Sequence, residues 1–160
     1  MSVPSDGSLL IAEVEASLTV ADTIEAYYDE FSAQTVNRTN PSREDRIVLA
    51  EILVNYYTAV ETLFLRVSQA FENNLDTARW HADLLDKMTL HIEGVRPQLI
   101  SDQTRDALRE LMRFRHFKRY YLEFDYDWDK LQFLEKKFNQ TRPVVRTEVT
   151  RFLDQLRNSG

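Results

Sequence analysis

Cationic side chains are concentrated in one stretch of the chain, between Arg105 and Arg119. This stretch holds six cations and two anions, a local net charge of +4, although the 160-residue chain has a formal net charge of −6. Arg105, Arg109 and Arg113 recur every four residues, so they share one face of a helix. Like charges in such a row repel one another unless an anion lies against them. Because a guanidinium offers a planar fork to phosphate oxygens, the row predicts an anion site, for which RNA phosphate is a suitable partner.

The same row of arginines can also be explained by ion pairs within the fold, without any ligand, and this structural interpretation stays open. The chain contains 26 acidic residues, and acidic side chains on neighbouring helices would neutralise individual arginines without any ligand. His116 follows Arg113 by three residues and lies near the same face. Because an imidazole titrates near neutrality, His116 is the nearby group best suited to moving protons, unless it is simply a hydrogen-bonded histidine at the surface of the fold.

Other residue patterns do not match a metal or cofactor site. The segment 123–129 alternates four acidic residues with three aromatic ones, and we interpret it as a loop whose aromatic side chains enter the core. Asp125 or Asp127 would then cap the next helix. His81 and His91 lie ten residues apart, and the Glu-x-x-His pairs of a di-iron bundle are missing. The sequence has no cysteine and no Gly-rich phosphate loop, so we expect neither a metal nor a cofactor.

Five helices are expected to position these side chains. Apolar residues recur at three- and four-residue spacing in five segments: about 9–34, a segment capped by Ser42 and ending near Phe71, about 77–91, about 102–121, and one from near Asp127 to about 156. Pro143 would kink or restart the last helix. Only three glycines and four prolines occur, too few for the many tight turns of a sandwich or barrel. The sequence therefore predicts an all-α, up-and-down bundle of about five helices.

Length and composition indicate one globular domain. Hydrophobic residues make up 43% and charged residues 29% of the 160 positions, which suits a single core. We expect residues 1–7 to form a flexible tail and residues 8–158 to form the domain. The N-terminal residues have no basic region followed by an apolar run, and no uninterrupted apolar stretch reaches the ~18 residues of a membrane span. We expect a cytoplasmic protein without membrane contact.

Three segments and the helix order resemble a known family. The segments are ILVNYYTAVETLFLRV in the second helix, WHADLLDKM in the third, and LRELMRFRHFKRYYLEFDYDWDKL around the fourth. They resemble HEPN-domain proteins, specifically the HepT-like toxins encoded beside minimal nucleotidyltransferase antitoxins. The resemblance covers nearly the whole chain, and FRHFKRYY is its most specific part. It implies a helical homodimer that cleaves RNA without a metal and is neutralised by its nucleotidyltransferase partner.

The family motif, Arg-x4-His-x-Tyr, is only partly present. When the motif is aligned on Arg115, its histidine falls on Tyr120 and its tyrosine falls on Leu122. Metal-free attack by an RNA 2′-hydroxyl needs a group that titrates near neutrality and a cation beside the developing phosphorane charge. Arg115 would supply the cation. A phenol, which titrates near pH ~10, is a poor base at neutral pH.

Two interpretations of the site follow, and both stay open. In the first, His116 works with Arg115 and with Arg109 or Arg113 in a displaced but active ribonuclease site; the broader family pattern allows four to six residues between its arginine and histidine, and six separate Arg109 from His116. In the second, Tyr120 has replaced the histidine. The protein is then a catalytically degenerate module that only binds the nucleotidyltransferase.

The remaining side chains near the motif are assigned from the same resemblance. Lys118 and Arg119 would join Arg109 and Arg113 in binding RNA phosphate. In the family, the antitoxin transfers adenylyl groups to the motif tyrosine, a position occupied here by Leu122. The neighbouring hydroxyl groups of Tyr120 and Tyr121 are the candidates for such a modification. We favour the simpler interpretation, in which one of these tyrosines packs inward and the other lies at a dimer cleft.

Overall fold

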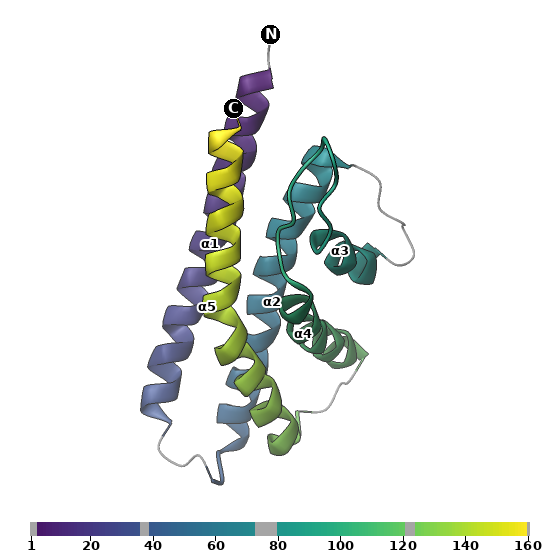
Figure 1. The fold of residues 1–160 in the computed structure, drawn as a ribbon. Coiled ribbons are helices and arrows are strands. Elements are labelled where there is room, and N and C mark those ends of the chain that lie inside the picture. The colour runs from purple at the N-terminus through teal and green to yellow at the C-terminus, as the bar shows by residue number, and fades with distance from the viewer. Residues whose placement is uncertain (1–2, 36–38, 73–79, 121–123, 160) are drawn as a thin grey trace.

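The computed structural model describes residues 3–35, 39–72, 80–120 and 124–159. These ranges contain five helices and no strand: α1 (Val3–Gln34), α2 (Arg43–Phe71), α3 (Trp80–Met88), α4 (Asp102–Tyr120) and α5 (Trp128–Asn158). Three long helices, α1, α5 and α2, lie side by side, and the shorter α3 and α4 lie beyond α2 (Figure 1). The predicted all-α bundle of about five helices is confirmed.

The central helix is α2, which contacts each of the other four helices. Ser42 caps it, with its side-chain oxygen accepting a hydrogen bond from the Asp45 N–H at 3.0 Å, as the sequence predicted. Its apolar side chains form the middle of the core, where Tyr56, Tyr57 and Phe64 are fully buried. By length and composition α2 would also suit a membrane span, but most of that segment is buried inside the bundle. Its apolar composition therefore follows from its central place in the fold.

The start of α4 is fixed by a buried carboxylate of α5. The Ser101 side chain accepts a hydrogen bond from the Thr104 N–H at 3.2 Å, which makes Ser101 the N-cap of α4. Glu148 accepts hydrogen bonds from the Ser101 N–H at 3.0 Å and from the Thr104 hydroxyl at 2.7 Å. A carboxylate is favourable at a helix N-terminus because the N–H groups there are unpaired within the helix. Glu148 thus docks the first turn of α4 onto α5.

Two helix boundaries differ from the prediction. α1 begins at Val3, within the stretch 1–7 that was predicted to be a tail; Pro4 fits there because the first helical turn needs no N–H donor from it. α3 ends at Met88 rather than near His91. The predicted start of the third helix, at about residue 77, lies outside the described residues.

A buried arginine explains the early end of α3. Arg96, whose side chain is 0% exposed, donates hydrogen bonds to the carbonyls of Lys87 (2.8 Å) and Leu90 (3.0 Å). These contacts satisfy carbonyl groups that a helix end leaves unpaired. Its charge is balanced by Glu72, the C-cap residue of α2, at 2.6 Å. The chain reverses between Ile92 and Arg96, where Gly94 has a φ of 72°, a conformation that favours glycine.

The last helix, α5, is continuous through Pro143. The alternative of a restarted helix is therefore wrong, and Figure 1 shows α5 changing direction along its length instead. Asp127 caps α5 by accepting a hydrogen bond from the Asp129 N–H at 3.2 Å, as predicted. Tyr126 is buried, but Phe124 is 63% exposed, so the prediction that all the aromatics of this loop enter the core is wrong for Phe124. The segment forms no strand, so alternate residues need not share a side.

Candidate functional site

Arg115 of α4 forms a buried ion pair with Glu61 of α2. Its Nη1 and Nη2 donate to the two carboxylate oxygens of Glu61 at 2.8 and 2.9 Å, and the two side chains are 11% and 8% exposed. Nη1 also lies 3.3 Å from the Thr58 hydroxyl oxygen. The guanidinium lies over the Tyr57 ring, 4.9 Å from its centroid. Because the contact with Glu61 is two-pronged, Arg115 is held in one orientation.

His81 of α3 meets the same pair. Its Nδ1 lies 2.7 Å from Oε2 of Glu61 and 3.2 Å from Nη2 of Arg115. The His81 ring stacks against Trp80, with 3.7 Å between ring centroids, and the His81 side chain is 37% exposed. A carboxylate, a guanidinium and an imidazole from three helices therefore converge at one point. Such a group can bind an anion and move a proton.

The phenol beside this cluster stays neutral. Burial raises the pKa of Tyr57 well above its ordinary value, and the negative charge of Glu61 raises it further, although Arg115 opposes both effects. Tyr57 therefore provides a neutral aromatic face beneath the Arg115 guanidinium, a favourable place for a cation. It cannot act as a base at neutral pH.

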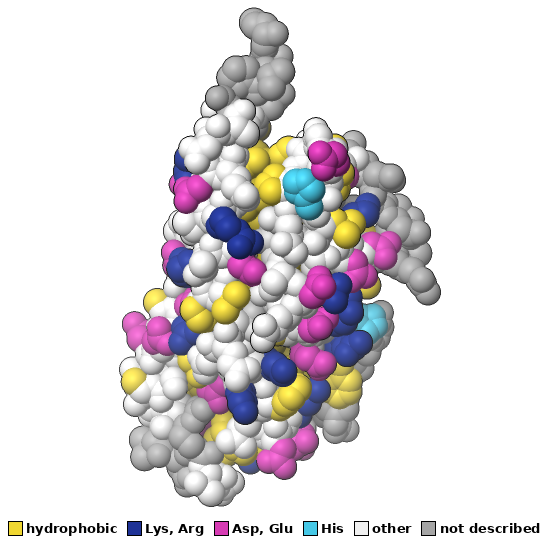
Figure 2. Space-filling view, in the orientation of Figure 1, with side chains coloured by type: hydrophobic (Ala, Val, Ile, Leu, Met, Phe, Trp, Pro, Cys, Tyr) yellow, Lys and Arg dark blue, Asp and Glu magenta, His cyan; other side chains and the backbone are white. Residues whose placement is uncertain are grey.

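Four of the other predicted cations of α4 have acidic neighbours. Arg105 lies within 4 Å of three aspartates, one on α3 and two on α4. The further pairs are Arg109–Asp86 (2.6 Å), Lys118–Glu51 (3.0 Å) and Arg113–Glu110 (3.4 Å). Figure 2 shows basic and acidic side chains lying beside one another on the α4 side of the visible face. Partners on a neighbouring helix, which the structural interpretation expected, are present for Arg105, Arg109 and Lys118, whereas Glu110 beside Arg113 belongs to α4 itself. Phosphate binding by these residues stays a prediction.

The structure places the predicted catalytic residues Arg115 and His116 in different surroundings. The imidazole beside Arg115 is that of His81, whereas His116 and Arg119 are exposed on α4. Tyr121 and the side chain of Tyr120 lie outside the described residues. Both tyrosines therefore keep their predicted roles, as catalytic or modified groups, only as predictions.

Comparison with known families decides the identity of the fold. Residues 48–156, from α2 through nearly all of α5, match the family described as HepT-like protein. The chain belongs to the HepT-like family. The resemblance that its motifs indicated is thereby confirmed. No curated protein and no solved structure gives a match. The whole of α1 precedes the matched residues.

Two residues of the candidate site, Glu61 and His81, were not predicted from the sequence. Glu61 follows Tyr57 by four residues and lies within the apolar stripe of α2, where a buried carboxylate requires a partner. A carboxylate at this position in the apolar stripe could therefore have predicted a buried ion pair. His81 gave no such signal, because its meeting with Glu61 depends on how α3 packs on α2.

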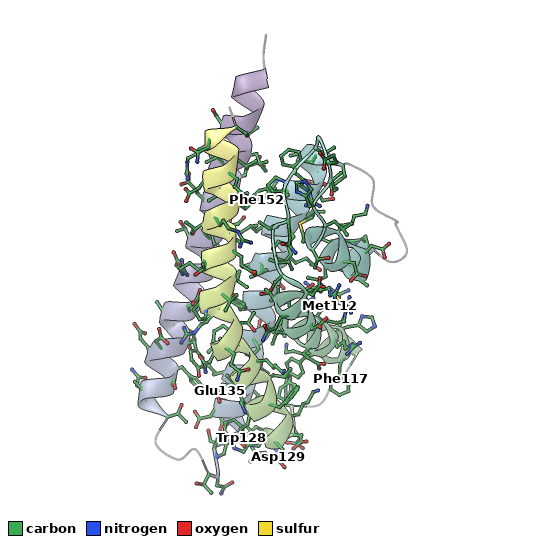
Figure 3. The ribbon with its side chains drawn as sticks, viewed as in Figure 1. Met112, Phe117, Trp128, Asp129, Glu135 and Phe152 are labelled. Atoms are coloured by element: carbon green, nitrogen blue, oxygen red, sulfur yellow. The ribbon has the colours of Figure 1, made fainter. Side chains whose placement is uncertain are left out.

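A separate hollow lies on the α4–α5 side of this HepT-like protein. It has a volume of about 450 Å³, and its lining includes Phe114, Phe117 and Tyr126, with Arg113 and Lys130 as its cations. Figure 3 places Phe117 on α4 and Trp128 at the start of α5, on the side of α4 away from α3. The lining does not include Glu61, His81 or Arg115. The hollow and the buried ion pair are therefore distinct features of α4.

Proposed function

We propose that this HepT-like protein is the toxin component of a toxin–antitoxin pair, a metal-independent RNA endonuclease neutralised by a cognate nucleotidyltransferase. The observation that carries the proposal is the setting of Arg115. The arginine that aligns with the family motif lies where a carboxylate and an imidazole converge, on a helix with five further cations. Metal-free phosphate transfer requires a fixed cation and a group that exchanges protons near neutrality.

The acidic neighbours of α4 are compatible with RNA binding. Exposed ion pairs contribute only about 0–1 kcal/mol, so a polyanion can replace Asp86 at Arg109 or Glu51 at Lys118 at small cost. The Arg113 side chain is 65% exposed, and Arg119 is exposed too. In the proposal these four side chains bind the RNA backbone on either side of Arg115.

A second candidate function is supported by the Arg115 ion pair itself. Both Nη atoms of Arg115 are bound by Glu61, and a buried pair is much more costly to open than an exposed one. The motif positions for histidine and tyrosine are also occupied by Tyr120 and Leu122. In this alternative the protein is a degenerate HEPN module that binds the nucleotidyltransferase without cleaving RNA.

The test is cleavage of a 5′-labelled structured RNA by the purified full chain in EDTA. The proposal predicts products that end in a 2′,3′-cyclic phosphate and a 5′-hydroxyl, and no cutting of the matching 2′-deoxy oligonucleotide. Arg115→Lys, which keeps the charge but not the fork, is expected to cleave more slowly. Arg157→Ala, near the C-terminal end of α5, is the matched control. Absence of cleavage by folded protein would favour the binding module.

Further parts of the proposal concern assembly and regulation. The family resemblance implies a homodimer, and light scattering of the purified chain would give twice the monomer mass. It also implies a stable complex with the nucleotidyltransferase, which co-purification tests. The composition of the sequence supports a cytoplasmic location.

Adenylylation at Tyr120 or Tyr121 would appear as an added mass in peptides spanning those residues after incubation with that partner and ATP.

A further inference from the structure

We propose that His81, oriented by Glu61, is the group that takes the proton from the attacking 2′-hydroxyl of RNA. This inference rests on the proposed ribonuclease function. It assigns the chemistry to a residue of α3 that lies outside the motif on α4. Two features support the inference. One is the ring nitrogen of His81 that carries the hydrogen, and the other is the exposure of the His81 side chain.

The hydrogen of the neutral His81 ring is placed by Glu61. A carboxylate paired with a guanidinium only accepts hydrogen bonds, and Oε2 of Glu61 lies 2.7 Å from Nδ1 of His81. The hydrogen in that contact must therefore be on Nδ1, which donates it to Glu61. The 3.2 Å approach of Nη2 of Arg115 to Nδ1 is then a contact between two donors, not a hydrogen bond. With Nδ1 protonated, the lone pair of the neutral ring is on Nε2.

The free nitrogen of His81 lies on the accessible side of the cluster. Both contacts of the ring with Glu61 and Arg115 involve Nδ1, and no hydrogen bond to Nε2 occurs among the described residues. The His81 side chain is 37% exposed, several times more than either member of the ion pair. Stacking on Trp80 restricts rotation of the ring. His81 thus connects the buried pair to the surface where RNA would bind.

The geometry allows a balanced reaction. Nε2 of His81 accepts the proton of the 2′-hydroxyl as its oxygen attacks the adjacent phosphorus. The bond from phosphorus to the 5′-oxygen breaks, and that oxygen takes a proton from water. The products are a 2′,3′-cyclic phosphate and a 5′-hydroxyl, and Nε2 returns its proton to the solvent. Glu61 stabilises the imidazolium that forms, and Arg115 provides positive charge beside it.

His116 is less well placed for this role. Consecutive residues of an α-helix are rotated by about 100°, so the side chains of Arg115 and His116 leave α4 in different directions. The structure places Arg115 against Glu61 and leaves His116 exposed. An orienting carboxylate is found for His81, at 2.7 Å.

The first experiment measures which nitrogen of His81 carries the hydrogen. The full chain is labelled with ¹⁵N-histidine, and its three histidines are distinguished with His91→Asn and His116→Asn. The expected signature at a pH above the imidazole titration is a protonated Nδ1 and an unprotonated Nε2 at His81, lost in Glu61→Gln. A protonated Nε2 at His81 would overturn the inference. This measurement does not depend on RNA cleavage.

The second experiment compares cleavage of a 5′-labelled RNA hairpin in EDTA by His81→Asn and His91→Asn. Asparagine keeps a donor near the position of Nδ1 but has no titrating nitrogen, so the contact with Glu61 is retained. His81→Asn is expected to slow cleavage by about 10²–10⁴-fold. His91, which lies near exposed Glu93 on the surface, serves as the control and its variant should cleave at the normal rate.

The outcomes separate the two proposals. If the unsubstituted protein cleaves no RNA, the proposed function fails, and the catalytic role of His81 fails with it. If the protein cleaves RNA and His81→Asn cleaves as fast as His91→Asn, only the inference about His81 is overturned. Loss of cleavage in His116→Asn alone would assign the proton transfer to His116.

Discussion

Glu61 and Arg115 join the central helix to the motif helix through two parallel hydrogen bonds, 2.8 and 2.9 Å long. Glu61 also lies 2.7 Å from Nδ1 of His81, so this one carboxylate contacts both groups of the candidate site. The same pair is buried beside Tyr57 in the core. The stability of the fold and the proposed activity therefore rest on the same side chains.

Removing Arg115 is expected to weaken the fold. Arg115→Ala leaves the Glu61 carboxylate buried without its guanidinium, which should lower the free energy of unfolding by about 3–5 kcal/mol. The double variant Glu61→Leu with Arg115→Met removes both charges. Its free energy of unfolding should therefore fall by less than that of Arg115→Ala. Urea unfolding of the three proteins measures both values. A double variant less stable than Arg115→Ala would contradict this account, and cleavage by Arg115→Ala must be scored on folded protein.

Arg96 is expected to be essential to the connection between α3 and α4. Its fully buried side chain donates to Glu72 and to the carbonyls of Lys87, Leu90 and Pro97. Arg96→Met would leave Glu72 without its cation and remove the donor from the Leu90 and Pro97 carbonyls, a cost of about 3–5 kcal/mol. Hydrogen exchange should also speed up at residues 89–101. Arg151→Met on the exposed surface of α5 is the control, and equal effects of the two substitutions would contradict the prediction.

Tyr28 of α1 is expected to stabilise the fold in a pH-dependent way. Its hydroxyl donates to Glu135 of α5 at 2.6 Å and accepts a hydrogen bond from Asn139 at 2.9 Å. Burial raises the pKa of Tyr28, and the hydrogen bond to Glu135 raises it further. At neutral pH, Tyr28→Phe should lower the free energy of unfolding by about 1–3 kcal/mol, because Glu135 loses a donor.

The sign of the pH effect follows from the raised pKa of Tyr28. Above pH ~10 the unfolded chain releases the phenolic proton while the folded chain retains it, so the unfolded state becomes relatively more stable. The contribution of Tyr28 is thus complete below pH ~10 and is lost as the pH rises through the raised pKa. The difference in the free energy of unfolding between the natural chain and Tyr28→Phe should therefore become smaller over that pH range. A difference independent of pH would show that the hydroxyl is not buried as described.

Local features of this fold could be predicted from the sequence, but contacts between residues far apart in the chain could not. The caps Ser42 and Asp127 and the stripe of α2 depend on residues within a few positions of one another. The contact of His81 with Glu61 depends instead on how α3 packs on α2. Arg115 was identified through the family motif, but its burial could not be deduced, because nothing in the spacing of the cations shows that Glu61 faces it. Phe124 departs from its pattern for a similar reason, since no strand enforces the alternation.

The last prediction concerns the exposed cations of α4. If Arg113 binds an RNA phosphate, Arg113→Ala should weaken RNA binding about equally for all sequences and reduce the slope of log affinity against log salt by about 1. Arg157→Ala removes a comparable surface arginine that pairs with Glu15 of α1, so it corrects for the change in net charge. Binding of a 2′-deoxy oligonucleotide across a salt series isolates this term from cleavage. Equal effects of both substitutions would mean that the attraction comes from the overall charge, and the assignment of α4 as the RNA-binding helix would be wrong.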